Sequence, residues 1–383
     1  MLVLQGMSVA GDVGVALGEA TAGWGHPSPD IIFVFASTKQ DPAAVARGLG
    51  ERFPGVLVVG CTTTGEHLSG EHYNGALVLT ALCDSGIRWS TAVVRDIAGL
   101  DEARAGQVVS ELFRGLDVNT EDFEPAEHFC MLFIDGLRGC EEVFSALIAE
   151  ALEGVKLVGG SAGDDLAFRE TRIIAGGEAL TDAAVLVMGH GAGKFEIFKH
   201  QHFTTTPRRL VVTKVSRGGR RVCELDGRRA LDAYASALGI ATEQVTDDVT
   251  FMNPVTFSCQ GEIYVRSIQR LDPDGTIDFY CGVEEGMVLE IGGHHSITEA
   301  LQADVTKITA RSGPLDFMLG YNCILRALEA DKEGLVGELG QLWRAASKTS
   351  IGFDTYGEQL DGLHINQTLV AIGFRDDASG RPA

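Results

Sequence analysis

The chain has 383 residues, 45% of them hydrophobic, and a formal net charge of −22 from 31 basic and 53 acidic side chains. This length favours two domains, each with its own core. The acidic balance argues against nucleic acids and anionic membranes as partners, because both require a basic surface. Since no apolar run reaches the roughly 18 residues of a membrane helix, and Asp12 interrupts the apolar N-terminus, we expect a cytoplasmic protein without membrane insertion.

The first predicted elements form a β-α-β unit. Residues 30–36 (DIIFVFA) indicate a buried strand, and residues 41–53 indicate a helix that Asp41 caps. The run VLVVG then indicates a strand that leads into the loop VVGCTTTGEH. Strands over 74–82 and 87–94 are expected next, with the turn residues CDSG between them.

The same order of elements returns about 99 residues later, after a predicted helix over 101–115. Its members are a strand at 128–135, a helix at 140–152, a strand at 156–159 that enters LVGGSAGDD, and strands at 183–189 and 194–200. This similarity indicates an internal duplication of the β-α-β unit, with a glycine-rich loop at each end.

A basic stretch at 204–222 marks a change in composition, and we place the domain boundary there, between residues 1–220 and 221–383. The second domain is predicted to contain a helix at 224–239, antiparallel strands within 257–283 around a DPDG turn, a strand at 314–322, a helix at 323–346, the loop SIGFDTYGEQ, and a strand at 366–374. The fold class is therefore α/β of the mixed α+β kind, with central mixed sheets flanked by helices.

Three related glycine loops are the strongest functional signal. The first and third share G-x-x-T-x-G-E at identical spacing, and the second ends in two aspartates. Glycine allows close backbone approach, and loops at strand ends are where α/β folds place ligands. The predicted ligand-binding residues are Cys61, Thr63, Gly65, Glu66, Ser161, Asp164, Asp165, Arg326, Asp354, Thr355, Tyr356, Glu358 and Asn366.

Several of these residues have a structural alternative. Asp164 and Asp165 suit a cation or an amine, and they equally suit turn capping. Cys61 ends an apolar strand, where a buried inert thiol is the favoured interpretation. Arg326 lies one helical turn after Cys323, so both can face one site, or Arg326 can point to solvent. The polar third loop can also hydrogen-bond its own backbone.

The segment GGSAG formally matches the G-x-S-x-G motif of hydrolases, with Ser161 as the nucleophile. That motif requires a helix directly after the serine, and DDLAFRETRII is a poor helix start. Hydrolase chemistry is therefore a remote alternative, and we expect a protein that is not an enzyme.

The phrases VVGCTTTGE, LVGGSAGDDLAF, LGYNCILR and GFDTYGEQLDGLHINQT resemble the FIST family over roughly residues 25–375. The resemblance implies an N-terminal and a C-terminal FIST module, and a ligand-sensing, non-catalytic role in signal transduction. The similar subgroup of nitric-oxide-sensing hemoproteins implies heme b and a partner histidine kinase. The alternative is an iron-free sensor of an amino-acid-like molecule.

A heme bound by this chain would be noncovalent, because C-x-x-C-H is absent. His364 leads the candidates for the iron ligand because it lies inside the family phrase, and a histidine suits heme iron. The other candidates are His67, His72 and His190.

Overall fold

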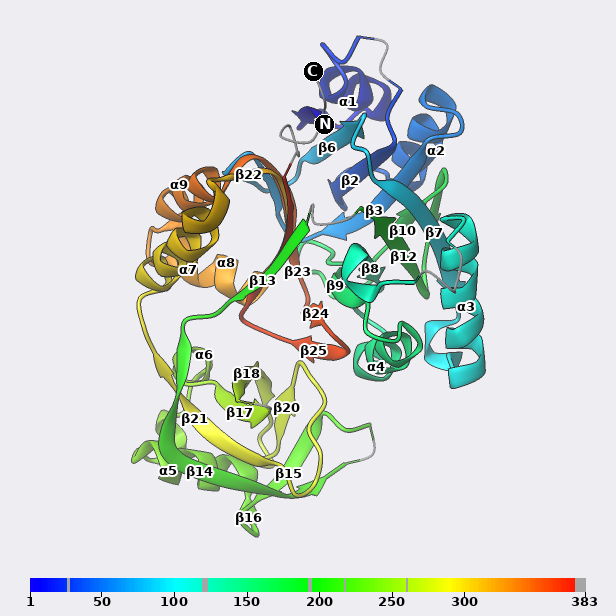
Figure 1. Ribbon diagram of the computed structural model, residues 1–383. Helices are drawn as coiled ribbons and strands as arrows, with labels where there is room; N and C mark the ends of the chain where they lie inside the picture. Colours follow the sequence, from blue (N-terminus) through cyan, green and yellow to red (C-terminus); the bar gives the residue numbers. More distant parts are fainter. Residues whose placement is uncertain (26–27, 119–122, 192–194, 217, 260, 376–383) are drawn as a thin grey trace. The chain divides into compact units, whose positions relative to one another are not determined.

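The computed structural model describes residues 1–25, 28–118, 123–191, 195–216, 218–259 and 261–375. The chain forms two compact units: the first contains residues 1–199, 302–363 and the chain from Leu369 onward, and the second contains residues 200–301 and 364–368. The expected mixed α/β class is confirmed (Figure 1). The boundary proposed at residues 220 and 221 concerns sequence modules and stays a prediction.

The first sheet of the first unit contains the opening β-α-β unit. Its strand order is β1 (Leu2–Ser8), β6 (Leu77–Cys83), β2 (Ile31–Ser37), β3 (Leu57–Thr63), β10 (Ile173–Ala175) and β11 (Glu178–Leu180). Helices α1 (Val13–Ala20) and α2 (Pro42–Arg52) pack against it through a shared apolar core. Asp41 caps α2 as predicted, because its carboxylate accepts hydrogen bonds of 3.0 Å from the Ala43 and Ala44 N–H groups.

The second sheet contains the duplicated unit. Its order includes β24 (Glu358–Leu360), β9 (Lys156–Ser161), β8 (His128–Ile134), β12 (Ala183–His190) and β7 (Arg88–Arg95), and β25 (Leu363–Ile365) follows β24. Helices α3 (Glu102–Gly115) and α4 (Glu141–Ala151) share a core with it. The strands β2 and β3 pair in parallel, as do β8 and β9, so the predicted duplication is confirmed. The CDSG turn joins strands of two different sheets, β6 and β7.

The third sheet repeats the same plan near the C-terminus. Its order is β13 (Phe195–His200), β26 (Leu369–Phe374), β22 (Leu315–Cys323), β23 (Ser347–Thr355), β4 (Glu66–Leu68) and β5 (Glu71–Tyr73). The single helix predicted at 323–346 is wrong, because α8 (Ile324–Lys332) and α9 (Val336–Ala346) are separate. Gly334 ends α8 with a φ of 72°, a left-handed conformation that glycine adopts easily.

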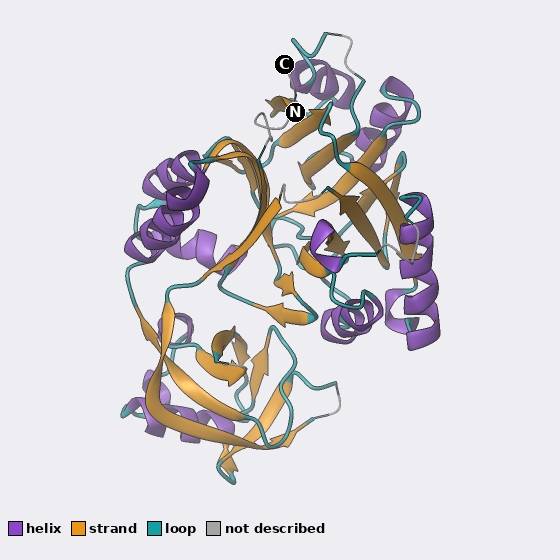
Figure 2. Cartoon of the chain, in the orientation of Figure 1, coloured by secondary structure: helices purple, strands orange, loops and turns teal. Residues whose placement is uncertain are grey.

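The hairpin after each glycine loop joins a neighbouring sheet. Strand β4 pairs with β23, β10 pairs with β3, and β24 pairs with β9, so the exchange is cyclic among the three sheets. In this unit helices lie on the outer sides and strands lie between them (Figure 2). Phe35, Phe133 and Phe353 come from three different sheets and contact one another, with ring centroids 4.5–6.2 Å apart. The three repeats therefore share one buried centre.

The second unit is built on an eight-stranded sheet. Its order is β18 (Glu262–Arg266), β17 (Val255–Cys259), β21 (Val288–His294), β14 (Phe203–Val215), β15 (Arg221–Leu225), β20 (Ile277–Phe279) and β19 (Ile268–Leu271), and β16 (Arg228–Arg229) pairs with β15. Helices α5 (Ala230–Leu238) and α6 (Asp247–Met252) belong to this unit, and α7 (Ile297–Ser312) begins in it and continues into the first unit at Gln302. Short 3-10 helices occupy Ile97–Gly99, Pro125–Glu127 and Thr242–Gln244.

The helix predicted at 224–239 begins only at Ala230. Asp226 and Gly227 adopt φ values of 53° and 69° and form a turn, so the preceding residues pair as strands. The antiparallel strands predicted around the DPDG turn are confirmed, because β19 and β20 pair across it. No helix in the described part of the chain is long and apolar enough to cross a membrane.

Candidate functional site

The three glycine loops meet inside the first unit. Backbone hydrogen bonds link each loop to the other two: Asp354 N–H to Gly65 O at 2.8 Å, Gly163 N–H to Thr62 O at 3.0 Å, and Ser161 N–H to Gly357 O at 2.8 Å. Loops separated by almost 300 residues are therefore neighbours.

Asp354 is the centre of a buried polar network. His67 Nε2 lies 2.8 Å from its Oδ1, and His72 Nε2 lies 2.7 Å from its Oδ2. Asn322 Nδ2 donates a third hydrogen bond to Oδ1 at 2.7 Å. The Asp354 side chain is fully buried, whereas the two histidines are slightly exposed.

A tight hairpin positions the two histidines. Strands β4 and β5 pair so that His67 and His72 lie directly opposite each other. The turn between them is Ser69–Gly70, with φ values of 49° and 78°, which suits a two-residue hairpin turn. Trp343 of α9 stacks on His67 with centroids 4.9 Å apart, and this contact fixes the imidazole plane.

Gly65 is required where the first loop meets this network. A Cβ at this position would lie 2.3 Å from Asp354 Oδ2 and 2.7 Å from His72 Nε2. A side chain does not fit at that distance, so only a glycine lets the backbone of the first loop lie this close to the Asp354 carboxylate and the His72 imidazole.

Arg326 of α8 lies beside the network and is 1% exposed. Its Nε donates to Asn322 Oδ1 at 3.0 Å, and its buried Nη1 has no hydrogen-bond partner. Burial lowers the pKa of this guanidinium to about 10, with nearby carboxylates such as Glu329 opposing that change. Arg326 therefore keeps its charge at neutral pH and has an unused donor. The interpretation of Arg326 as solvent-exposed is wrong.

The pKa values of the two histidines shift in opposite directions. Burial alone would raise the pKa of Asp354, but the interactions with His67 and His72 outweigh it and hold that pKa well below its usual range. Burial lowers the pKa of His67. At His72, the hydrogen bond and charge of Asp354 overcome burial and raise the pKa. His72 is therefore the more basic member of the network.

These residues border a small cavity of about 30 Å³. Its lining consists of His67, Gly70, His72, Asn322, Arg326, Ala327, Ala330, Val336, Leu339, Gly340 and Trp343. The volume accepts about two water molecules or a compact head group. The sequence interpretation identified Arg326 and Asp354, named His67 and His72 only as iron-ligand candidates, and missed Asn322 and Trp343. The spacing H-x-S-G-x-H, with its hairpin turn, is the signal that could have paired the histidines.

The threonines and glutamates of the shared motif brace the loops. Thr63 Oγ1 donates to Glu66 Oε1 at 2.5 Å, and Thr355 Oγ1 donates to Glu358 in the same way. Burial raises the pKa of Glu66 to about 7, although hydrogen bonds from Thr63 and the Ala76 N–H oppose that rise.

The two aspartates of the second loop are hydrogen-bonded to other groups of the protein. Asp164 accepts hydrogen bonds from the N–H groups of residues 168–170 and from the Tyr356 hydroxyl at 2.5 Å. Asp165 accepts from Ser37 Oγ at 2.9 Å and from the Thr38 N–H at 2.8 Å. These contacts favour the capping interpretation of both aspartates, and they make Tyr356 a link between the second and third loops.

Cys61 and Ser161 are buried and are not at the cavity. Burial raises the pKa of the Cys61 thiol well above its usual value, which is expected of an inert core cysteine. Ser161 Oγ accepts a hydrogen bond from Gln359 Nε2 at 2.9 Å, and residues 162–172 form no helix after it. The geometry of a nucleophile elbow is therefore absent around this serine.

His364 and Asn366 belong to the second unit. His364 is 2% exposed, and its backbone carbonyl accepts a hydrogen bond of 2.9 Å from Arg266 Nη1. Asn366 Oδ1 accepts from Cys281 Sγ at 2.6 Å.

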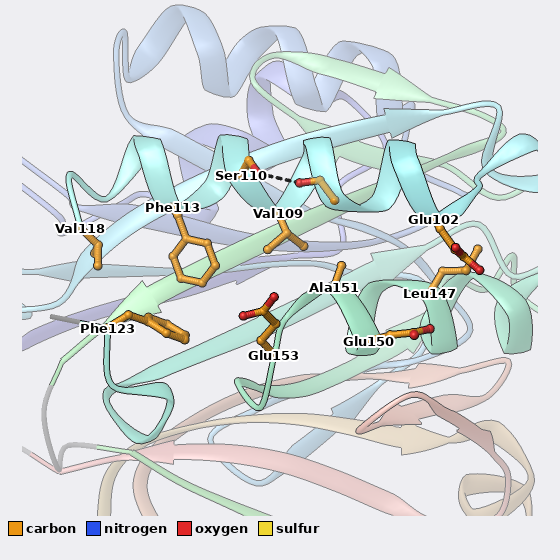
Figure 3. A pocket seen from close by; sticks show the side chains of 11 residues that line it. Glu102, Val109, Ser110, Phe113, Val118, Phe123, Leu147, Glu150, Ala151 and Glu153 are labelled. Atoms are coloured by element: carbon orange, nitrogen blue, oxygen red, sulfur yellow. Dashed lines mark hydrogen bonds between the residues drawn. The ribbon is translucent and has the colours of Figure 1, made fainter. Parts of the chain in front are cut away.

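A larger groove of about 430 Å³ lies between α3 and α4 (Figure 3). Its floor is apolar, with Val109, Phe113 and Leu147, and its labelled acids include Glu150 and Glu153. The Ser110 hydroxyl donates to its own helix at Gly106 O. None of the predicted site residues lines this groove. We therefore favour the smaller cavity, where buried polar groups converge.

Comparisons with known proteins agree with the repeated motifs. Residues 30–228 match the FIST N domain, and residues 230–361 match the FIST C domain. No curated protein matches the sequence. Among solved structures, cyanuric acid hydrolase from A. caulinodans is similar at 9% identity and a TM-score of 0.38, with 98% of this chain and 100% of that chain covered. The two domain matches show that the chain belongs to the FIST family.

Proposed function

We propose that this member of the FIST family senses a small molecule that carries a carboxylate, as amino acids do, and binds it beside Arg326. FIST domains are sensory domains of signal transduction proteins and bind small ligands. The observation that supports a carboxylate is the buried Arg326 guanidinium, whose Nη1 has no partner and borders the cavity. Guanidinium and carboxylate form strong charge-assisted hydrogen bonds, and burial makes such a pair selective.

The size of the cavity limits what can bind there. About 30 Å³ accommodates a head group rather than a whole ligand. His67 and His72 are the partly exposed residues of the network, so the rest of a ligand would extend past them.

We propose a sensor without catalytic activity that acts in the cytoplasm through a separate partner, such as a histidine kinase.

Heme-dependent nitric oxide sensing stays a prediction, and neither the cavity beside Asp354 nor the surroundings of His364 fit heme. A porphyrin is much larger than the cavity beside Asp354. The His364 imidazole is buried at 2% exposure, whereas an iron ligand needs open space for the macrocycle on its free side. An ultraviolet–visible titration with hemin, before and after nitric oxide, tests this prediction. A saturable one-to-one Soret band that His364→Ala changes would favour heme over our proposal.

The proposed ligand class is tested with thermal shift and calorimetry on the full chain. The probes are the standard amino acids, together with their amides, which lack the carboxylate. We expect at least one amino acid to stabilise the protein by about 2.7 kcal/mol at one hundred times its Kd, and its amide to have no effect.

Two matched variants assign the effect to the cavity. Arg326→Gln should abolish the shift, whereas Arg95→Gln, which changes an exposed arginine paired with Glu178, should preserve it. Equal affinity of an acid and its amide, or unchanged binding by Arg326→Gln, would overturn the proposal.

A further inference from the structure

We infer that His67, His72 and Asp354 form a binding site for one divalent transition-metal ion, of which Zn²⁺ is the best chemical match. One ring nitrogen of each histidine and a carboxylate oxygen of Asp354 lie within 4.8 Å of one another. Two imidazoles and one carboxylate are a ligand set typical of Zn²⁺ in proteins, with a position left open for a further ligand.

The distances already approach those of a metal site. Zinc binds imidazole nitrogen and carboxylate oxygen at about 2.0–2.2 Å, so tetrahedral ligand atoms lie about 3.3 Å apart. In the structure, the two imidazole nitrogens are 2.8 and 2.7 Å from the carboxylate oxygens that they face. The two imidazoles would move away from the carboxylate as metal–ligand bonds replace these contacts. Each ring would then carry its proton on Nδ1, leaving the Nε2 lone pair for the metal.

The surroundings hold the three ligands in place. Asn322 Nδ2 donates to Asp354 Oδ1, and the Trp343 ring stacks on His67, so both groups fix the orientation of a ligand. Outer contacts of this kind tune metal affinity. The hairpin register fixes His72 opposite His67, so the site is largely formed before an ion arrives.

The local charge also favours a cation. Glu66, Glu329, Asp354 and Glu358 are at most 1% exposed, and all interact electrostatically with Arg326 or His72. Among the described residues of this cluster, Arg326 is the sole buried guanidinium. A buried group of four acids and one arginine gains electrostatic stability from a divalent ion.

The metal site is independent of the proposed ligand class, although both use one cavity. Arg326 is not a metal ligand here, because its guanidinium has no lone pair to offer. Failure of one proposal therefore leaves the other intact, because a Co²⁺ titration tests the metal site and the comparison of amino acids with their amides tests the ligand class.

The test is a titration of the chelator-treated full chain with Co²⁺, followed by Zn²⁺. We expect one equivalent of Co²⁺ to bind with the strong visible absorption of a tetrahedral site, Zn²⁺ to displace it, and the thermal midpoint to rise. His67→Gln and His72→Gln should each weaken binding by at least 10-fold.

His190→Gln is the matched control. His190 Nδ1 lies 2.9 Å from His128 Nε2, so this variant alters a histidine pair without a carboxylate, and it should retain one equivalent. Sub-stoichiometric binding, or binding that survives both His67→Gln and His72→Gln, would overturn the inference. If circular dichroism shows that a histidine variant is unfolded, the titration of the parent chain still tests the inference. The absence of a one-to-one Co²⁺ spectrum in the parent chain would refute the site.

Discussion

Asp354, Ser161 and Thr62 occupy equivalent positions in the three repeats, each where a hairpin from another repeat joins the sheet. Thr62 Oγ1 accepts from the Arg172 N–H, and Ser161 Oγ accepts from Gln359 Nε2, both at 2.9 Å. At the third junction the same position is a buried carboxylate that meets His67. The same junction therefore occurs in all three repeats, and the one at Asp354 contains ionisable groups suited to binding.

The residues that the loops share are mostly structural. Thr63 with Glu66, and Thr355 with Glu358, satisfy each other inside the turns. Motif repetition thus located the loops correctly from the sequence, while the cavity depends on residues that are not repeated. His67 was named only as an iron ligand because its contact with Asp354 spans 287 positions of the chain.

Substitution of Gly65 should disturb this junction. Gly65→Ala places a Cβ 2.3 Å from Asp354 Oδ2, so we expect a loss of about 1–3 kcal/mol in the free energy of unfolding, measured with urea. Gly106→Ala is the control, because its Cβ would have no neighbour within 4 Å inside α3, and it should be neutral or stabilising. Equal stability of the two variants would contradict the close approach described here.

At the scale of elements, local sequence patterns predicted most strands and helices, but they did not predict which strands pair with each other. The cap of α2 and the parallel strands β2 and β3 follow from residues close in sequence. The pairing of β4 with β23 does not, because each strand is short and their register depends on the assembled centre. The two wrong helix boundaries have one cause: left-handed turns at Gly227 and Gly334 were not recognised.

An ion-pair cluster on the second unit's sheet gives a pH prediction. Arg221 of β15 donates to Asp278 of β20 at 2.7 Å, and Arg270 of β19 donates to the same carboxylate. The hydrogen bond from Arg221 lowers the pKa of Asp278 below its ordinary value, although burial opposes this. A carboxylate with a lowered pKa in the folded state stabilises the protein above its unfolded pKa and loses that contribution as pH falls.

We therefore expect the wild type to lose stability below about pH 4, where unfolded aspartate begins to take up protons. Asp278→Asn should be less stable at neutral pH and should show a shallower acid dependence. Urea midpoints measured between pH 3 and 7 by a probe in the second unit test this. If the urea midpoints of the two proteins changed with pH in parallel, protonation of Asp278 would not contribute to the acid dependence of stability.

At the scale of the whole molecule, the first unit depends on both ends of the chain. Residues 1–199 supply the whole first sheet and most of the second, and residues 302–374 supply β24 to the second sheet and three of the six strands of the third. The sequence indicated two modules in tandem, because composition changes near residue 210. That module boundary stays a prediction, and the compact units follow a different division, in which the residues of the second unit lie between segments of the first in the chain. Local composition cannot reveal that arrangement, since it depends on pairing between distant strands.

A fragment that ends at residue 220 should therefore not fold on its own. It would lack β23 and β24, which pair with β4 and β9, and it would expose the face of Phe35 that packs on Phe353. Unpaired strand edges and an open apolar centre favour aggregation over a native state. We expect the fragment to lack near-ultraviolet circular dichroism and a cooperative urea transition, both of which the full chain should show. A cooperative transition with native-like near-ultraviolet dichroism would mean that the first two repeats close without the third, and that the shared centre is not what holds the loops together.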